Sequence, residues 1–277
     1  MQYSIKTFTK QSSLAALCIA IYGCGAGSYD RNQQVSIRDQ HTIAYSVNAE
    51  KRLHPRLLLQ GQVNNFKITD SLNLIDDGRH QDVLLANNTQ WEGPTKLNQK
   101  ANLRDAGLVL LASPVNNEFL EVNLGGGLRY LEGDLRLSTA AQQETIDVVS
   151  KTGLSINSYV KYKFSPVLAF SIGATGGHFE SARRSMMIDA GLHWTPIQHI
   201  QFDFGLFHYI YENDISDHNK STKDYQLQSR RIYMGNNEDT ATSCTDDIPH
   251  PSCPKGNYDS AVKITTRGLK AGVSFVF

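Results

Sequence analysis

The chain has 277 residues, and its 27 basic and 27 acidic side chains give a formal net charge of zero. This balance, without any basic run, offers no electrostatic basis for binding nucleic acid. After the N-terminus no apolar stretch reaches about 18 residues, which excludes a transmembrane helix. The mean hydropathy of −0.36 is still compatible with a membrane β-barrel, whose strands show only alternate residues to lipid.

The N-terminus has the pattern of an export signal. Lys6 and Lys10 precede a short apolar segment at 14–22, and small residues follow it. The residues that end in Cys24 also resemble a bacterial lipobox, in which the cysteine is lipidated, although Tyr22 departs from that motif. An unmodified Cys24 beside a cleavage site is the alternative. We therefore expect a signal peptide over 1–24 and a single mature domain over 25–277.

Apolar and polar residues alternate with a period of two along most of the mature chain. Successive side chains of a strand point to opposite faces, so this alternation predicts strands with one apolar face. In the segment 186–194, for example, Ile188 and Leu192 alternate with Asp189 and Gly191. The segments with this pattern are 35–49, 56–69, 103–112, 118–131, 153–164, 167–177, 185–195, 200–212 and 261–277.

The connections between these segments differ in length. Short turns lie at 53–55, 114–117, 165–167 and 196–199, whereas long polar stretches lie at about 71–102, 137–150 and 213–262. Short turns at one end and long loops at the other are typical of transmembrane β-barrels, as are aromatic residues near the strand ends. A soluble β-sandwich is the alternative. The glycine-rich second face argues against it, because small residues make room for large ones in a narrow lumen.

The number of strands is open between eight and twelve. Bacterial single-chain barrels have an even number of strands, so the segments above require a further one, which 27–36 would supply. A hidden pair in 71–102 or 213–235 would give twelve, and loss of one segment would give eight. The sequence thus predicts an all-β fold, a transmembrane antiparallel β-barrel of about ten strands with long external loops near 71–102 and 213–262.

The second face of the predicted strands carries charges of both signs. Charges in a narrow lumen must pair or stay hydrated, which favours a plugged network of salt bridges over a small selective pore. The predicted lumen residues are Arg38, Asp105, Glu121, Arg129, Lys161, Lys163, Asp189, His193, Asp203 and Lys270.

Two cysteines, Cys244 and Cys253, lie in a polar segment near the C-terminus. In an exported protein such a pair predicts a disulfide that closes a loop. A zinc site would need more ligands, and His250 between two cysteines at this spacing matches no recognised zinc motif.

The last strand carries a resemblance to a family. Leu269, Val273, Phe275 and Phe277 alternate with polar or small residues, and the phenylalanine is terminal. This segment resembles the terminal recognition strand of Gram-negative outer-membrane proteins, which the barrel assembly machinery reads. The resemblance implies an integral outer-membrane β-barrel at the cell surface. In its size, and in showing no passenger segment, the chain is similar to a solitary autotransporter-type barrel domain.

Candidate sites at the predicted external end are weak. His208, Glu212, Asp214, Asp217 and His218 follow one strand without the spacing of a known hydrolase, so a solvated rim is favoured over a catalytic or cation-binding site. A second group holds His178, Glu180, Arg183 and Arg184, and its arginines suit the phosphates of lipopolysaccharide. The glycine run 125–127 lacks the other residues of a phosphate loop.

The favoured function is a non-enzymatic scaffold or surface-interaction barrel in the outer membrane, in contact with outer-membrane lipid and lipopolysaccharide. We predict no catalytic residue, cofactor, metal or nucleic-acid partner, and the ligand of the external loops is unknown. A narrow porin or transport channel is the first alternative. An outer-membrane hydrolase or lipid-modifying enzyme is the second.

Overall fold

The computed structural model describes residues 34–86, 89–179, 182–214, 227–233 and 261–277, which belong to one compact unit. All regular elements within these residues are β-strands. None of the described residues forms a helix that is long and apolar enough to cross a membrane. The predicted signal peptide 1–24, with Cys24, lies outside the described residues.

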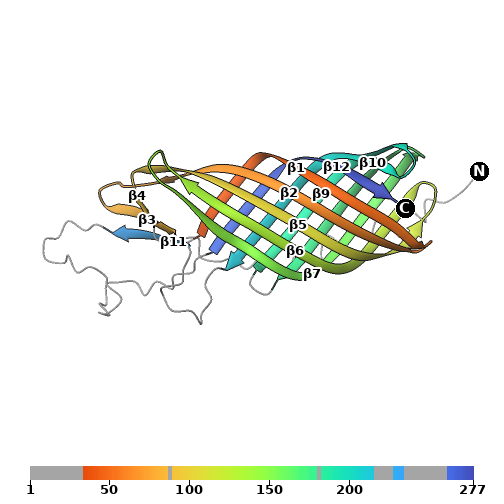
Figure 1. The fold of residues 1–277 in the computed structure, drawn as a ribbon, viewed down its shortest axis with the longest axis horizontal. Helices are drawn as coiled ribbons and strands as arrows, with labels where there is room; N and C mark the ends of the chain where they lie inside the picture. Colours follow the sequence, from red (N-terminus) through yellow and green to blue (C-terminus); the bar gives the residue numbers. More distant parts are fainter. Residues whose placement is uncertain (1–33, 87–88, 180–181, 215–226, 234–260) are drawn as a thin grey trace, which may run out of the picture. The chain divides into compact units, whose positions relative to one another are not determined.

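Nine strands form a closed barrel (Figure 1). The expected all-β barrel of about ten strands is therefore confirmed, and each of its strands overlaps one of the segments with alternating polarity. The barrel strands are β1 (Gln34–His54), β2 (Leu57–Leu74), β5 (Thr95–Asn116), β6 (Leu120–Ser138), β7 (Gln143–Ser165), β8 (Leu168–Phe179), β9 (Ala182–Ile197), β10 (Ile200–Asp214) and β12 (Ala261–Val276).

The barrel closes through one parallel pair. Going round the wall, the order is β1-β12-β10-β9-β8-β7-β6-β5-β2, and β1 runs parallel to β12 from the pair Gln34 and Ala261 to the pair Glu50 and Val276. The other neighbours are antiparallel. The first and last of an odd number of up-and-down strands must point the same way. The even number of strands that we expected is therefore not needed for closure.

Tight turns gather at one end of the barrel, which we call the short-turn end. They join β1 to β2, β5 to β6, β7 to β8 and β9 to β10, at the positions where the sequence places short turns. In one of them Asn117 Oδ1 accepts hydrogen bonds from the backbone N–H groups of Phe119 (2.9 Å) and Leu120 (2.7 Å). The C-terminus lies at the same end, because the backbone N–H of Phe277 donates to the Glu50 carbonyl at 2.8 Å.

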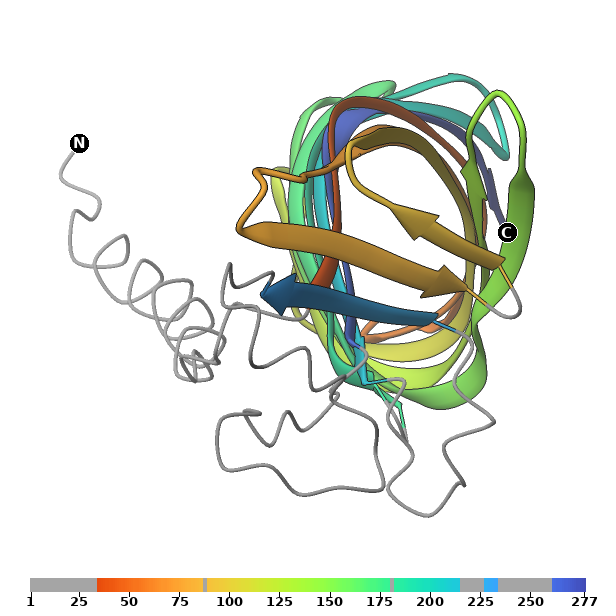
Figure 2. The ribbon, with the colours of Figure 1, turned by 90° about the vertical axis from the view of Figure 1, so that its left-hand side faces the viewer.

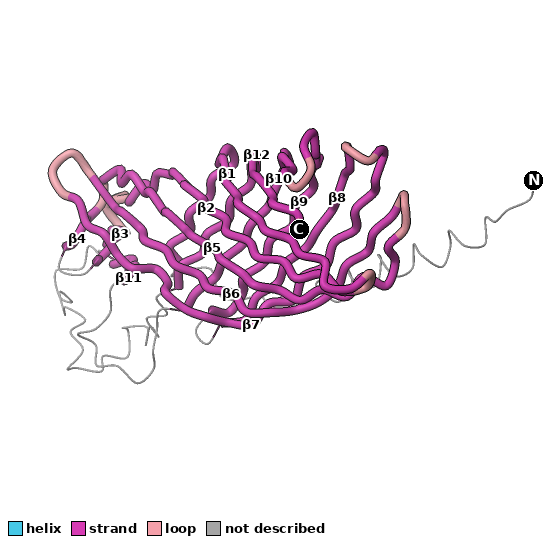
Figure 3. The backbone as a smooth tube through the Cα atoms, turned by 45° about the vertical axis from the view of Figure 1, so that its right-hand side comes forward, coloured by secondary structure: helices cyan, strands magenta, loops and turns pink. Residues whose placement is uncertain are grey.

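The opposite end, which we call the distal end, is built from much longer strands than expected (Figure 3). The pairing of β2 with β5 continues up to Leu74 and Thr95, and that of β6 with β7 up to Ser138 and Gln143. Most of the segment 71–102, which we expected to be an external loop, is strand, because it holds these ends of β2 and β5 and two further short strands.

Three short strands make a second sheet at the distal end. They are β3 (His80–Ala86), β4 (Thr89–Glu92) and β11 (Leu227–Tyr233), in the order β11-β3-β4. Figure 2 shows them across the opening of the barrel. Leu84 and Trp91 belong to the same buried cluster as Leu97 and Ile146 of the barrel wall. The small sheet thus packs onto the distal end through apolar side chains.

The wall of the barrel has two halves of opposite polarity. In the half next to the short turns, which we call the belt half, the outer face is apolar. Large exposed side chains there include Ile43, Tyr45, Val47, Leu108, Leu124, Leu128, Leu154, Ile156, Tyr162, Ile172, Ile188, Leu192, Trp194, Phe204, Leu206, Leu269 and Phe275. The lumen of this half holds buried polar residues, among them Ser46, Glu121, Asn123, Asn157, Ser171, Thr175, Gln201, Asp203 and Ser274.

In the other half, which we call the distal half, the two faces are exchanged. The lumen is filled by buried apolar and aromatic side chains, including Ile37, Phe66, Ile68, Leu97, Leu103, Leu131, Leu135, Leu137, Ile146, Tyr209, Tyr211, Val262 and Ile264. The outer face is polar and exposed, with Arg38, Lys67, Thr69, Lys96, Asn98, Lys100, Asn102, Arg104, Glu132 and Arg136. The distal half therefore is apolar inside and polar outside, as an ordinary soluble protein is. The belt half is polar inside and apolar outside.

Candidate functional site in the barrel lumen

A fully buried ion pair lies where the two halves meet. Arg129 of β6 contacts Asp105 of β5 through both its Nε, at 2.6 Å from Asp105 Oδ1, and its Nη2. Both side chains have 0% exposure, and the Arg129 guanidinium lies 5.9 Å from the centre of the Phe179 ring. A bidentate arginine–carboxylate pair is strong and directional, and each charge depends on the other for its burial. The pair thus separates the polar lumen from the apolar one.

A second charged cluster lies at the mouth of the short-turn end. Glu121 forms an ion pair with Arg52 and a longer one with Lys163, whose Nζ lies 3.5 Å away. Asn123 Nδ2 also donates to Glu121 Oε1 at 3.0 Å. Lys163 in turn donates to the Asn117 carbonyl at 3.1 Å, which links this cluster to a tight turn.

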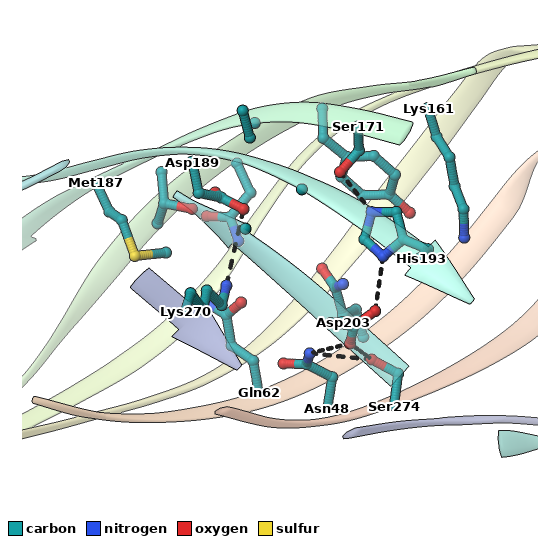
Figure 4. A pocket seen from close by; sticks show the side chains of 18 of the residues that line it. Asn48, Gln62, Lys161, Ser171, Met187, Asp189, His193, Asp203, Lys270 and Ser274 are labelled. Carbon is teal, nitrogen blue, oxygen red and sulfur yellow. Dashed lines mark hydrogen bonds and ion pairs between the residues drawn. The ribbon is translucent and has the colours of Figure 1, made fainter. Parts of the chain in front are cut away.

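Between these two clusters, a histidine connects a serine to a carboxylate (Figure 4). Ser171 Oγ of β8 lies 2.6 Å from His193 Nε2, and His193 Nδ1 lies 2.7 Å from Asp203 Oδ1. His193 is on β9 and Asp203 on β10, so three consecutive strands supply one residue each. We call Ser171, His193 and Asp203 the lumen triad.

Strand register brings the lumen triad together. His193 and Asp203 are directly paired residues of the β9–β10 hairpin. On the other side His193 pairs with Ala169, which places Ser171 diagonally across from it on the same face. Diagonal neighbours lie within reach of long side chains. The site is therefore fixed by backbone hydrogen bonds in three strands and not by a loop.

Other polar residues hold the Asp203 carboxylate in place. Gln201 Nε2 donates to Asp203 Oδ1 at 2.7 Å, and Ser274 Oγ and Asn48 Nδ2 donate to Oδ2, the latter at 3.3 Å. Lys161 Nζ donates to Gln201 Oε1 at 3.0 Å and adds a positive charge beside the group. Both carboxylate oxygens therefore have defined partners, which restricts the orientation of His193.

Two cavities meet at the lumen triad. An inner cavity of about 90 Å³ is lined by all three of its residues, together with Gly173 and Gly191. An outer cavity of about 360 Å³ lies at the short-turn mouth and is lined by Phe119 and residues 163–169. Both cavities include Lys161, His193 and Gln201 in their walls. Of the lumen triad, only His193 lines both cavities, so it is the member that a small molecule in the outer cavity could contact.

The structure places most of the predicted lumen residues on the inner face. Lys270 lies 3.7 Å from Asp189 there, in a further ion pair between β12 and β9. Arg38 is the exception and is exposed on the outer face. The register of β1 shifts between Asp39 and Thr42, and this irregularity reverses the faces of the residues that precede it. The remaining members, Asp105, Glu121, Arg129, Lys161, Lys163, His193 and Asp203, belong to the clusters described above.

Residues at the distal rim are brought together only in part. Glu212 pairs with Lys263 at 2.6 Å, and His178 is exposed. Most of the other rim candidates lie outside the described residues or side chains, namely Glu180, Arg183, Arg184, Asp214, Asp217 and His218, as do Cys244 and Cys253. The disulfide therefore stays a prediction. Within the described part of the chain, no cluster of His, Cys, Asp and Glu has the arrangement of a metal site.

The glycine run lies in β6 and serves the packing of the wall. A Cβ atom on Gly125 or Gly127 would come within 2.0 Å of a carbonyl oxygen of the neighbouring strand β5. The glycines thus allow β5 and β6 to approach closely, which agrees with the absence of a phosphate-loop motif.

Ser171 and the residues around Asp203 were missed at the level of sequence. A signal was available, because a hairpin centred on the turn at 196–199 places His193 opposite Asp203. Comparisons with protein-family models, with curated proteins and with solved structures find no match. The interpretation of the lumen therefore depends on its geometry alone.

Proposed function

We propose that this chain is an integral outer-membrane β-barrel of a Gram-negative bacterium, with the belt half in the bilayer and the distal half projecting from it. The observation that carries the proposal is the apolar outer face of the belt half. Soluble monomers rarely expose a contiguous apolar patch of more than a few hundred Å². Here exposed large apolar side chains come from eight of the nine barrel strands, and on β2 the half-buried Val63 pairs with the exposed Val47 of β1.

The height of the apolar face supports a bilayer as its partner. On β6 the outward-facing apolar residues run from Leu120 to Tyr130. Ten steps of about 3.3 Å, tilted by about 40°, rise about 25 Å, which is the height of the lipid-facing band in transmembrane barrels. Above Tyr130 the next outward residue is Glu132, so the band ends within one residue pair.

The contents of the lumen favour a plugged barrel and argue against an open channel. The distal half is filled by stacked aromatic rings, such as Phe66 and Tyr209 at 4.9 Å between centroids, and by many buried aliphatic residues. Apolar side chains packed inside a barrel oppose the passage of ions, which would have to lose their hydration shells there. The function that we favour is thus a membrane anchor that presents its distal half and outer loops to partners at the cell surface, lipopolysaccharide among them.

The C-terminal strand supports recognition by the barrel assembly machinery. Leu269, Val273, Phe275 and Phe277 lie on the outer face of the belt half, and the Phe277 backbone pairs with β1 next to the closing seam. Closure leaves no strand edge unpaired in lipid, where each free backbone group would cost several kcal/mol. The finer resemblance to an autotransporter-type domain stays a prediction.

Cell fractionation together with conductance tests the proposal. The full chain should be found in the outer membrane, change its gel mobility on heating, and give no discrete conductance steps in a planar bilayer. Deletion of Phe277 should leave secretion intact but reduce insertion, with degradation in the periplasm. A wild-type protein that accumulates as a soluble periplasmic species would refute the membrane assignment, and stepwise conductance would refute the closed lumen.

A further inference from the structure

The lumen triad has the connectivity of an acyl-transfer site. We propose that Ser171, His193 and Asp203 hydrolyse short-chain carboxylic esters that enter the lumen from the short-turn end, with Ser171 as the nucleophile. The proposal goes beyond the membrane-barrel function and does not depend on it, because the triad faces the lumen whatever surrounds the belt half. It departs from the expectation that the chain has no catalytic residue.

The hydrogen bonds define the role of each group. Because the Asp203 carboxylate can only accept, His193 Nδ1–H donates the hydrogen bond to it, and the lone pair of Nε2 is then directed at the Ser171 hydroxyl. In this tautomer the imidazole can accept the Ser171 hydroxyl proton, and the carboxylate stabilises the imidazolium that results. Gln201, Ser274 and Asn48 hold the carboxylate, so His193 is oriented before any substrate arrives.

The surroundings of Ser171 leave space for a reacting carbonyl group. Its direct partner on β9 is Gly191, and the next inward residue on its own strand is Gly173, so neither neighbour covers the hydroxyl with a side chain. The inner cavity of about 90 Å³ lies at this position. A space of this size suits an acyl group of a few carbon atoms, and the larger outer cavity suits the leaving alcohol.

Lys161 supplies a positive charge where negative charge would develop. It is the direct partner of Ser171 in the β7–β8 pairing, and it lines both cavities. Groups that are already oriented toward a developing oxyanion stabilise it more strongly than water does. Lys161 would thus act on the tetrahedral intermediate, whereas Gln201 would hold Lys161 in position.

The reaction balances without a cofactor. Ser171 Oγ forms a bond to the carbonyl carbon while His193 Nε2 takes the hydroxyl proton. The tetrahedral intermediate then expels the alkoxide, which leaves as an alcohol with the proton from His193. Water repeats the sequence on the acyl-serine, giving the carboxylic acid and free Ser171.

Covalent labelling of the full folded chain in detergent micelles tests the proposal. Diisopropyl fluorophosphate should add one diisopropylphosphoryl group, which peptide mass analysis should place on Ser171. Ser171→Ala should abolish the adduct. His193→Gln should slow labelling, and hydrolysis of p-nitrophenyl acetate, on the order of 100-fold or more, the range that a general base contributes. Lys161→Met should lower kcat with little change in KM.

A second lumen serine provides the control. Ser155 of β7 is buried, and its hydroxyl makes no hydrogen bond to any described residue. Ser155→Ala should label at the wild-type rate. Heat-dependent gel mobility should verify that each variant is folded. A folded wild-type protein that takes no label at Ser171 would overturn the proposal, as would a Ser171 labelling rate that His193→Gln leaves unchanged.

Discussion

The belt half and the distal half share the same continuous strands but place apolar side chains on opposite faces. On β6, Arg129 points inward and Tyr130 outward, whereas Leu131 points inward and Glu132 outward. Neither the hydrogen-bonded ladder nor the period of two changes at this point. Alternation therefore specifies a strand, whereas the polarity of each face reflects the medium beside it.

The two halves also differ in what stabilises the lumen. In the distal half, burial of aliphatic and aromatic side chains provides the hydrophobic driving force for folding. In the belt half the inner face is polar, and its buried charged groups are stabilised by hydrogen bonds and opposite charges. A substitution in the Asp105–Arg129 pair at the boundary should therefore lower the free energy of unfolding more than a single substitution within either half.

The largest effect is expected from Asp105→Ala, which leaves the Arg129 charge buried without its partner. Removing one member of a buried ion pair costs about 3–5 kcal/mol of folding free energy. Urea unfolding of the barrel in micelles would measure it. The double variant Asp105→Ala with Arg129→Met should recover much of that loss. A loss below about 1 kcal/mol for the single variant would mean that Arg129 is hydrated.

A substitution inside each half compares their lumens. Leu103→Ala should destabilise the distal half by about 2–5 kcal/mol, because it opens a cavity in a packed core. Ser155→Ala is the matched change in the belt half and should alter the free energy of unfolding by less than about 1 kcal/mol, because it removes no packed apolar group. Equal losses for the two variants would contradict the difference between the two lumens.

A substitution on the outer face of each half compares the media that surround them. Leu192→Arg places a charge on the belt and should cost about 2–4 kcal/mol if it lies near the bilayer midplane. Asn102→Arg, on the exposed face of the distal half, should stay within about 0.5 kcal/mol of wild type. Folding into vesicles would provide the measurement. Equal tolerance of the two arginines would contradict the proposal that a bilayer surrounds the belt half.

The smallest effect is expected at a partly hydrated pair of the belt lumen. Asp189 lies 3.7 Å from Lys270, and neither side chain is fully buried. Asp189→Asn should therefore lower stability by at most about 1 kcal/mol, as for other solvent-accessible ion pairs. The same vesicle-folding assay would report it, and a loss as large as that of Leu192→Arg would reverse the assignment of the two faces of β9.

Much of the wall could be predicted from alternation alone. Leu120, Val122 and Leu124 against Glu121 and Asn123, for example, predict both the strand and its faces. The distal extensions were missed because their alternation is mostly polar. In β5 the outward Lys96, Asn98 and Lys100 conceal the inward Leu97 and Ala101, and the whole segment has the composition of a loop.

Three features needed the structure. The irregularity between Asp39 and Thr42 reversed the face of Arg38, and the alternation does not reveal it because Ile37 and Ile43, on either side of it, both occupy odd positions. The parallel closure of β1 on β12 depends on the ends of the sheet meeting, which no local pattern encodes. The lumen triad comes from three strands, and Ser171 reaches His193 because the register of β8 and β9 pairs His193 with Ala169.

The two tryptophans of the chain lie in different halves, so their fluorescence can test whether lipid surrounds the belt half and not the distal half. Trp194 is 49% exposed on the belt, whereas Trp91 is 4% exposed in the distal core. Single-tryptophan variants, Trp91→Phe and Trp194→Phe, would be folded into vesicles that contain lipids brominated on their acyl chains. Lipid around the belt half alone should quench Trp194 strongly and Trp91 little. Equal quenching of both, or none of Trp194, would contradict it.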